Sequence, residues 1–417
     1  MILLLLLLII LILLSFPISL SIGVATTFAF IKSHLPLYMI DQRMFSGLNS
    51  YMLLAVPLFM FAGNLMDQGG LSRRIVRLAE SLVGHLRGGL AISAILSSML
   101  FAGVSGSAAA DTAAIGSILI PSMIKRGYNR DFAASVVASG GSIGVIIPPS
   151  IPMIIYGFIT GLSIGKLFIA GILPGLLIGI SLSVVAVIFA DNTHKSRMRF
   201  EFKEFIEALK DSIWALGTPF IVIGGILGGV FTATESAACA VFYSLVVGIF
   251  VYKEINPKNL YKSAVESIVT SSVILIIIAV ATVFSWYLSM NNIQVMLQKV
   301  FLSFSNDKLL LILMVNLFLL IMGTFVETTA SLVLFVPVVA PILSQVGINP
   351  ITSGVMIVTN LAIGMLTPPL GICLIVSSAI AESSIVKLSK AVFPFLLVMI
   401  IDLLIISFFQ PITTLLL

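Results

Sequence analysis

Long apolar segments follow one another along nearly the whole chain, and this feature constrains the fold more than any other. They lie at about 2–31, 51–67, 89–122, 131–160, 168–190, 213–231, 236–252, 265–288, 308–343, 351–382 and 389–410. Each is long enough for a helix that crosses roughly 30 Å of hydrocarbon. Backbone polar groups in a bilayer must be satisfied within such a segment, which favours helices. We therefore predict an all-α polytopic membrane protein with no soluble domain of ordinary size.

Composition agrees with this prediction and excludes several classes. Of the 417 residues, 59% are hydrophobic and 9% are charged, which lies outside the range of soluble domains. The net charge of +5 comes from short basic loops, so we expect membrane lipids and no nucleic acid as partners. The first segment lacks a basic region and a small-residue cleavage site, which indicates a retained span. Cys239 and Cys373 lie far apart inside apolar segments, so neither a disulfide nor a thiolate metal site is indicated.

Two of these segments, 89–122 and 308–343, are too long for one helix across a bilayer. Small, hydroxyl or acidic residues occupy their centres: Gly103, Ser105, Gly106 and Ser107 in the first, and Gly323, Thr324, Glu327 and Thr328 in the second. Irregular backbone at membrane depth is tolerated where it is buried in protein or lines a cavity. Each segment therefore predicts a re-entrant helical hairpin with its tip inside the membrane.

A shift of 220 residues superposes the second half of the chain on the first without a gap. The matched positions are mostly glycine and proline, which fix bends and breaks in a backbone. They are Gly103 with Gly323, Pro121 with Pro341, Gly127 with Gly347, Asn129 with Asn349, Ile143-Gly144 with Ile363-Gly364, Pro148-Pro149 with Pro368-Pro369, and Pro174 with Pro394. The chain is therefore predicted to contain two copies of one unit.

Charge gives the relative orientation of the two copies. The loop at 125–130 carries three basic residues, whereas its counterpart at 344–350 carries no charge. Likewise, the amphipathic stretch 71–88 carries four arginines and its counterpart 291–305 carries only one lysine. Basic loops lie on the cytoplasmic side of a membrane. The two copies are therefore predicted to be inverted.

These features divide the chain into four parts. They are an N-terminal scaffold span (1–50), a first inverted repeat with arm helix, hairpin and broken helix (51–190), a cytoplasmic linker with a pair of scaffold helices (191–262), and a second inverted repeat with the same parts and a last span (263–417).

Two prolines in a row interrupt the helix after each hairpin. The first break reads Gly144-Val145-Ile146-Ile147-Pro148-Pro149-Ser150, and the second reads Gly364-Met365-Leu366-Thr367-Pro368-Pro369-Leu370. Tandem prolines remove two backbone donors and leave carbonyls upstream without partners. A desolvated cation can satisfy such carbonyls, as in the discontinuous helices of transporters. A single break would favour a structural kink, but two breaks in inverted copies, each beside a hairpin tip, favour a pair of cation sites.

The hairpin tips supply further oxygen atoms. Hydroxyls such as those of Ser105 and Ser107 suit a hard cation, although small residues at close helix contacts need no function. A carboxylate within the membrane is costly and normally faces a cavity or a partner. We therefore predict that Asp111 lines the substrate path, with Glu327 and Glu235 as secondary candidates.

Two segments match enzyme motifs only in part. Gly103-Val104-Ser105-Gly106 fits the pattern of intramembrane serine proteases, which need a histidine beside the serine. The three histidines of the chain fall in loops or interfacial stretches. Gly161–Lys166 lacks the four-residue spacer and the final hydroxyl residue of a phosphate-binding loop. We therefore expect neither proteolysis nor ATP hydrolysis, and we expect that the chain is not an enzyme.

The combination of motifs resembles the large membrane subunit of the tripartite ATP-independent periplasmic (TRAP) transporters. The segments that carry it are Gly103–Asp111 (GVSGSAAAD), Gly141–Pro149 (GSIGVIIPP), Thr234–Ala238 (TESAA) and Thr367–Gly371 (TPPLG). The resemblance covers nearly the whole chain. It implies an elevator mechanism in the bacterial inner membrane, driven by co-transported sodium. It also implies two partners, a small four-helix membrane subunit as a separate chain and a periplasmic substrate-binding protein.

The resemblance also implies site residues. A first sodium site is expected at Ser105, Gly144, Ile147 and Ser150, and a second at Gly323, Gly364, Thr367 and Leu370. Substrate contacts are expected at Asp111, Ser107, Glu327 and Thr328. Relatives often have a serine where this chain has Ala102, so that a ligand of the first site is either absent or supplied by Ser107. They often have aspartate where Glu327 stands, which keeps the charge but lengthens the reach.

The expected function is sodium symport of a small organic anion, a carboxylate, with sodium as coupling ion and no cofactor. A stand-alone anion symporter of a related inverted-repeat family is one alternative. A proton-translocating or channel-like subunit is another, but it would have carboxylates or histidines through several spans, whereas here polar residues gather at two tips. The two copies differ most where Asp111 matches Ser331 and Ser107 matches Glu327, and we expect selectivity to reside there.

Overall fold

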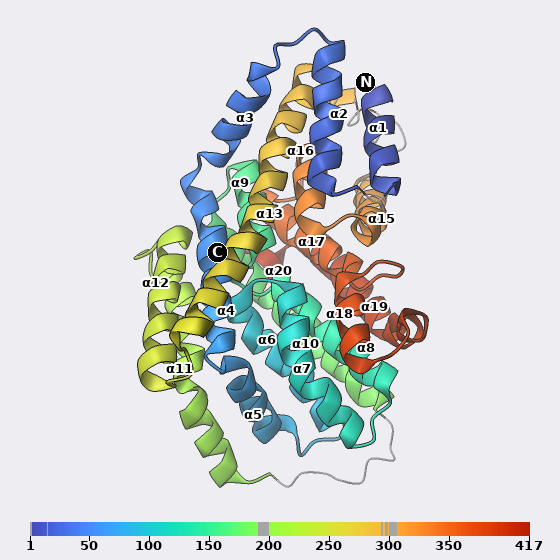
Figure 1. Ribbon diagram of the computed structural model, residues 1–417. Coiled ribbons are helices and arrows are strands. Elements are labelled where there is room, and N and C mark those ends of the chain that lie inside the picture. Colours follow the sequence, from blue (N-terminus) through green and yellow to red (C-terminus); the bar gives the residue numbers. More distant parts are fainter. Residues whose placement is uncertain (1, 15, 191–199, 293–294, 297–298, 300–306) are drawn as a thin grey trace.

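The computed structural model describes residues 2–14, 16–190, 200–292, 295–296, 299 and 307–417, and Figure 1 shows its helices. Within these residues all regular structure is helical. The helices are α1 (Ile2–Leu13), α2 (Ile18–Lys32), α3 (Tyr38–Leu48), η1 (Tyr51–Leu54), α4 (Ala55–Gln68), α5 (Leu71–Val83), α6 (Gly89–Ser105), α7 (Ala108–Lys125), α8 (Arg130–Ser142), η2 (Ile143–Val145), α9 (Ile151–Thr160), α10 (Ile164–Phe189), α11 (Phe202–Leu227), α12 (Ala233–Val246), η3 (Val247–Val251), α13 (Pro257–Met290), α15 (Lys308–Phe325), α16 (Thr328–Gln345), α17 (Pro350–Gly364), α18 (Ile372–Ala381), α19 (Ile385–Phe408) and α20 (Pro411–Thr414).

The lengths and hydropathy of these helices match a membrane protein. Among the described residues, seven helices are long and apolar enough to cross a bilayer, or eight if the bent pair α3 and α4 forms one span. Several long helices also expose large apolar side chains, such as Ile180 on α10 and Phe220 on α11. The prediction of an all-α polytopic membrane protein is confirmed.

The first apolar segment forms two helices. α1 ends at Leu13, and α2 begins directly after Pro17, which has no amide hydrogen and an extended ψ of 136°. The two helices have 12 and 15 residues, and each is shorter than the roughly 20 residues that cross a bilayer. They pack against each other and lie side by side in Figure 1. The prediction of one continuous span over 2–31 is therefore wrong, and the backbone at Pro17 explains why.

A group of helices gathers around α13 (Figure 1), and α13 itself also packs on α16 of the second hairpin. α13 packs along α2, α3 and α4, while α12 packs against both α4 and α11. An ionic cluster ties this group to α5. The Arg74 guanidinium lies 3.2 Å from Asp211 and 2.8 Å from Glu254, and it covers the ring of Tyr252 at 3.7 Å from the centroid. The counterpart of α5, predicted at 291–305, lies almost entirely outside the described residues.

Both predicted hairpins are helix–turn–helix pairs, and both predicted breaks interrupt helices. α6 and α7 pack together, as do α15 and α16. α8 and α9 flank the first Pro-Pro pair, and α17 and α18 flank the second. The bounds of α7 and α16 lie 220 residues apart, and so does the start of α8 from that of α17. The helix order therefore follows the sequence repeat, while the inverted relation of the copies stays a prediction.

The two copies are interwoven at their breaks. α18, the second half of one broken helix, packs on α7 and α8 of the other copy. In the same way α9 packs on α16 and α17. A hydrogen bond from the Tyr156 hydroxyl to the Pro350 carbonyl (3.0 Å) joins the middle of α9 to the start of α17. Each hairpin tip therefore lies close to helix breaks, which is where the candidate site forms.

Candidate functional site

The tip of the first hairpin packs directly against the first helix break. Gly106 closes the turn between α6 and α7 with a left-handed φ of 63°. A Cβ at this position would lie 2.6 Å from the Pro149 carbonyl oxygen, so only glycine allows the two segments to approach this closely. The Ile151 amide donates a 3.4 Å hydrogen bond back to the Gly106 carbonyl. The sequence prediction that tip and break adjoin is confirmed for this copy.

Asp111 fills the space between tip and break. It is fully buried, and its Oδ1 accepts a short hydrogen bond from the Ser105 hydroxyl. Its Oδ2 has no hydrogen-bond partner among the described residues and faces the Cα of Gly144, where a Cβ would collide with it. Three predicted residues, Ser105, Asp111 and Gly144, thus meet at one point. They place a carboxylate and a hydroxyl beside the backbone of the first break, and oxygen atoms of this kind suit a hard cation.

The other residues expected at the first sodium site have different surroundings. The Ser150 hydroxyl donates to the Val145 carbonyl (2.5 Å) and accepts from the Met153 amide (3.3 Å), so it caps the start of α9. The side chain of Ile147 packs against Gly175 of α10.

The second tip meets the second break by backbone contact. A Cβ on Gly364 would lie 2.6 Å from both the carbonyl carbon and the carbonyl oxygen of Gly323. The Thr367 hydroxyl donates to the Ile363 carbonyl (2.8 Å), and Leu370 is half exposed. The structure thus brings Gly323 and Gly364 together as predicted. No carboxylate lies between them, in contrast to the first copy.

Glu327 caps its own helix. Its carboxylate accepts hydrogen bonds from the amides of Thr329 (2.9 Å) and Ala330 (3.2 Å), and from the Thr329 hydroxyl (3.0 Å). A carboxylate at a helix N-terminus is favourable because it satisfies unpaired N–H groups and the helix dipole. The side chain lies at the second tip as predicted, but its oxygens are committed to α16.

A cavity of about 260 Å³ lies between the two tips and the second break. Predicted residues from both copies line it, namely Ser107, Gly323, Glu327, Thr328, Gly364 and Leu370. Asp111 does not line this cavity. Its side chain turns from the tip toward the first break at Gly144, and a place for Asp111 on the substrate path stays a prediction.

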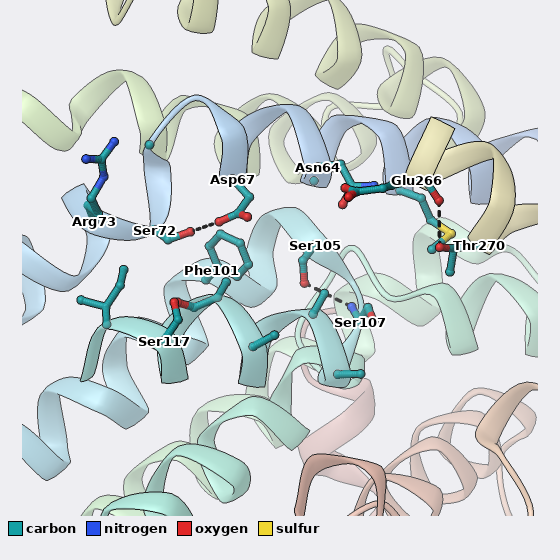
Figure 2. A pocket seen from close by; sticks show the side chains of 18 residues that line it. Asn64, Asp67, Ser72, Arg73, Phe101, Ser105, Ser107, Ser117, Glu266 and Thr270 are labelled. Carbon is teal, nitrogen blue, oxygen red and sulfur yellow. Dashed lines mark hydrogen bonds between the residues drawn. The ribbon is translucent and has the colours of Figure 1, made fainter. Parts of the chain in front are cut away.

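A larger cavity of about 680 Å³ lies between the first hairpin and the helices around α13, and Figure 2 shows its walls. One wall is polar and holds Asn64 and Asp67 of α4, Arg73 of α5, and Glu266 and Thr270 of α13. The facing wall belongs to α6 and α7 and consists largely of small residues: Ser105, Ser107, Ala109, Ala110, Ala113, Ala114 and Ser117. Ser107 and Ala109 line both cavities.

Sequence reasoning missed the polar wall of this larger cavity. Asn64 and Glu266 belong to segments read simply as spans, and the Asn64 amide donates to the Ser267 hydroxyl (2.8 Å). Polar and acidic residues within a membrane span normally face a cavity or a partner, and this was the signal in the sequence. Glu235, a secondary candidate from the sequence, forms a capping box with Thr232 at the start of α12 and lines neither cavity.

The chain is similar to known proteins along most of its length. Residues 5–412 match the family described as "Tripartite ATP-independent periplasmic transporter, DctM component". The isethionate TRAP transporter permease protein DctMQ of Oleidesulfovibrio alaskensis is 40% identical over 395 residues, which cover 94% of this chain and 62% of that protein. The sialic acid TRAP transporter large permease protein SiaM of Vibrio cholerae is 38% identical over 95% of this chain and 93% of its own length.

The fold has a solved counterpart. The crystal structure of the Alcanivorax borkumensis YdaH transporter superposes with a TM-score of 0.64 at 14% identity, covering 89% of this chain and 87% of that one. This likeness supports the fold alone. Together with the family match and the relatives above, it establishes a multi-pass membrane protein. The chain belongs to the DctM component family of the TRAP transporters, as a large permease subunit and not an enzyme.

Proposed function

We propose that the chain couples sodium entry to the import of a small organic anion across the bacterial inner membrane. Its partners would be a small four-helix membrane subunit and a periplasmic protein that delivers the anion. The names of the relatives support this substrate class. They mention isethionate, sialic acid and C4-dicarboxylates, and a further relative from Escherichia coli, 38% identical, is named for 2,3-diketo-L-gulonate. All of these are organic acids.

The observation that carries the proposal is the meeting of both hairpin tips and a helix break at one cavity. Two polar tips at a discontinuous helix are the arrangement by which secondary transporters bind substrate and ions together. The 260 Å³ of space suits a small molecule. We assign the anion to this cavity, at Ser107 and Thr328.

We place the first sodium ion between Ser105, Asp111 and the break at Gly144, with the carbonyls of Ile147 and Ser150 as further candidates. The unpartnered Asp111 Oδ2 supports this assignment, because a buried carboxylate without a partner is costly unless a cation satisfies it. The second ion is placed at Gly323, Gly364, Thr367 and Leu370, where backbone oxygens would have to serve as ligands.

The larger cavity supports an elevator movement. Its hairpin wall of alanine and serine offers little to interlock with the polar wall, so the two surfaces can slide past one another. Arg73 at its rim belongs to the basic α5, which the positive-inside rule places at the cytoplasm. We infer that this cavity opens inward and that the described conformation is the inward-facing one.

Uptake by proteoliposomes tests the proposal. The driving force is sufficient, since each cation that crosses 100 mV contributes about 2.3 kcal/mol. With the small subunit and binding protein present, we expect uptake of an organic acid that requires external sodium and increases with an inside-negative potential. Uptake that is indifferent to both would refute the coupling. Equal uptake without the binding protein would favour the stand-alone symporter instead.

A further inference from the structure

Four helices begin at the tips and breaks, and they differ in how their first turns are capped. Ser150 caps α9, and Glu327 caps α16. By contrast, α7 begins after Ser107 and α18 after Gly371, and no side chain caps either helix. The first N–H groups of a helix have no partner within it and carry the positive end of its dipole. Two of the four helix ends therefore lack a side-chain cap, and at α18 the Cys373 amide donates to the Met365 carbonyl (3.1 Å).

Both uncapped ends line the 260 Å³ cavity between the tips. Ser107 and Ala109 line it at the start of α7, and Gly371 and Ile372 line it at the start of α18. No lysine, arginine or histidine is among the described residues that line this cavity. Its one charged side chain, Glu327, is held by the amides of α16. An acidic ligand in this cavity would therefore have to bind to helix ends and hydroxyls.

Thr328 provides an independent sign of a ligand. It is 3% exposed and lines the same cavity, and its hydroxyl has no hydrogen-bond partner in the described chain. The neighbouring Thr324 lines the cavity too, but its hydroxyl donates to the Leu320 carbonyl at 2.8 Å. A buried hydroxyl without a hydrogen-bond partner costs free energy. A ligand oxygen atom that accepts from the Thr328 hydroxyl is the simplest explanation.

We propose that the acidic group of the transported anion, a carboxylate or a sulfonate, binds between the N-termini of α7 and α18. The hydroxyl of Thr328 and the amide of Ile372 donate hydrogen bonds to it. This inference rests on the proposed function and deepens it, because it names the subsite and the chemistry that recognises the acid. It also explains why organic acids can be held without a cationic side chain, since charge-assisted bonds from backbone amides suffice.

Two substitutions remove one donor each. Thr328→Val replaces the hydroxyl by a methyl group, and Thr324→Val is its control in the same cavity. Ile372→Pro deletes the amide hydrogen at the first position of α18, where proline is well tolerated in helices. The ψ of 107° at Gly371 is compatible with a following proline. Ile372→Val keeps the amide and serves as the second control.

The full chain in lipid nanodiscs is titrated in sodium chloride with succinate, isethionate and N-acetylneuraminate, and thermal stabilisation gives the apparent affinity. For whichever anion stabilises the wild type, Thr328→Val and Ile372→Pro should each weaken binding about tenfold or more, while both controls stay within about threefold. Succinate and isethionate separate carboxylate from sulfonate recognition. Stabilisation by sodium alone should be unchanged in all four variants.

Unchanged anion affinity in Thr328→Val and Ile372→Pro, with a wild type that responds, would overturn the subsite and leave the proposed function intact. A wild type that responds to sodium but to none of the anions would overturn both. Loss of sodium stabilisation together with anion binding in these variants would show a structural role for the two residues and would also count against the subsite.

Discussion

The two hairpin tips occupy equivalent places in the chain but use their carboxylates differently. In the first tip, Asp111 lies in the first turn of α7 and faces into the helix break at Gly144. In the second tip, Glu327 lies at the N-cap of α16 and binds the amides of its own helix. Relative to their helices, the two carboxylates are only one turn apart. A displacement of one helical turn therefore separates a carboxylate that packs against a helix break from one that caps its own helix.

The breaks differ in a complementary way. Gly364 rests on the backbone of Gly323, so the second tip and its break touch directly. Gly144 rests on the side chain of Asp111, so the first tip and its break are separated by a carboxylate. At the position equivalent to Asp111, Ser331 donates only to the Val326 carbonyl at 3.2 Å. The first copy is therefore the one suited to a charged ligand site, and the second depends on backbone.

The largest expected effect comes from Asp111→Asn, which keeps the shape and removes the charge. Because the charge of the ligands sets cation affinity, the sodium concentration for half-maximal uptake should rise about 100-fold. Proteoliposome uptake over a range of sodium concentrations measures it. Glu382→Gln, at a largely exposed carboxylate that pairs with Arg130, is the control and should behave like the wild type. A normal sodium dependence in Asp111→Asn would remove the distinction between the tips.

Substitution of Gly364 should have the next largest effect. In Gly364→Ala the new methyl group meets backbone atoms that cannot move aside, so we expect a loss of about 1–3 kcal/mol in stability. Gly323→Ala at the same contact meets mainly the flexible end of Leu361 at 3.2 Å and should cost less. Thermal unfolding in nanodiscs compares the two. Equal melting temperatures would show that the second tip and break do not touch as described.

Gly144→Ala is the equivalent substitution in the first break. Its methyl group would displace the Asp111 side chain rather than backbone, so sodium affinity should fall more than stability does. Adding Asp111→Ala should then recover stability without recovering sodium dependence. A double variant that is no more stable than Gly144→Ala alone would contradict this contact.

Glu327→Gln should have a moderate effect, on stability more than on sodium dependence. Loss of a charged cap typically costs about 1 kcal/mol, so the melting temperature should fall while sodium dependence changes less than about threefold. Glu327→Asp, which can still cap, should restore most of the stability. If Glu327→Gln instead weakens sodium coupling as strongly as Asp111→Asn, the second carboxylate is a cation ligand and not a cap.

The smallest effect is expected for Ser331→Ala. The hydrogen bond from its hydroxyl to the Val326 carbonyl contributes about 1 kcal/mol or less. Uptake and sodium dependence should match the wild type within experimental error. A large loss of sodium coupling would mean that the position equivalent to Asp111 is functional in both copies.

Sequence patterns predicted the parts of the fold that proline, glycine and hydropathy determine locally. The hairpins, the two broken helices and the contact of Gly323 with Gly364 follow from such residues. Pro17 was equally visible, but its effect was underestimated because continuous apolar sequence hides a break. The capping box of Glu235 with Thr232 was also visible in the sequence, as a threonine three residues before a glutamate. Local sequence patterns therefore predict helices, helix breaks and helix caps.

Side-chain directions at the tips could not be predicted in the same way. Whether Asp111 faces the cavity or the break depends on how α7 packs on α8 and on α18, and α18 is distant from α7 in the sequence. The polar wall of Asn64 and Glu266 likewise forms only when α4 and α13 lie together. The interweaving of α9 and α18 with the opposite copies also has no local signal. These features come from tertiary packing.

The number of sodium ions that each chain binds tests the central claim most directly. Equilibrium binding of radioactive sodium to the purified chain in nanodiscs should give two ions for the wild type, one for Asp111→Asn and two for Glu327→Gln. This result would show that the first tip uses its carboxylate for a cation and that the second does not. Two ions retained in Asp111→Asn, or one ion lost in Glu327→Gln, would contradict the account.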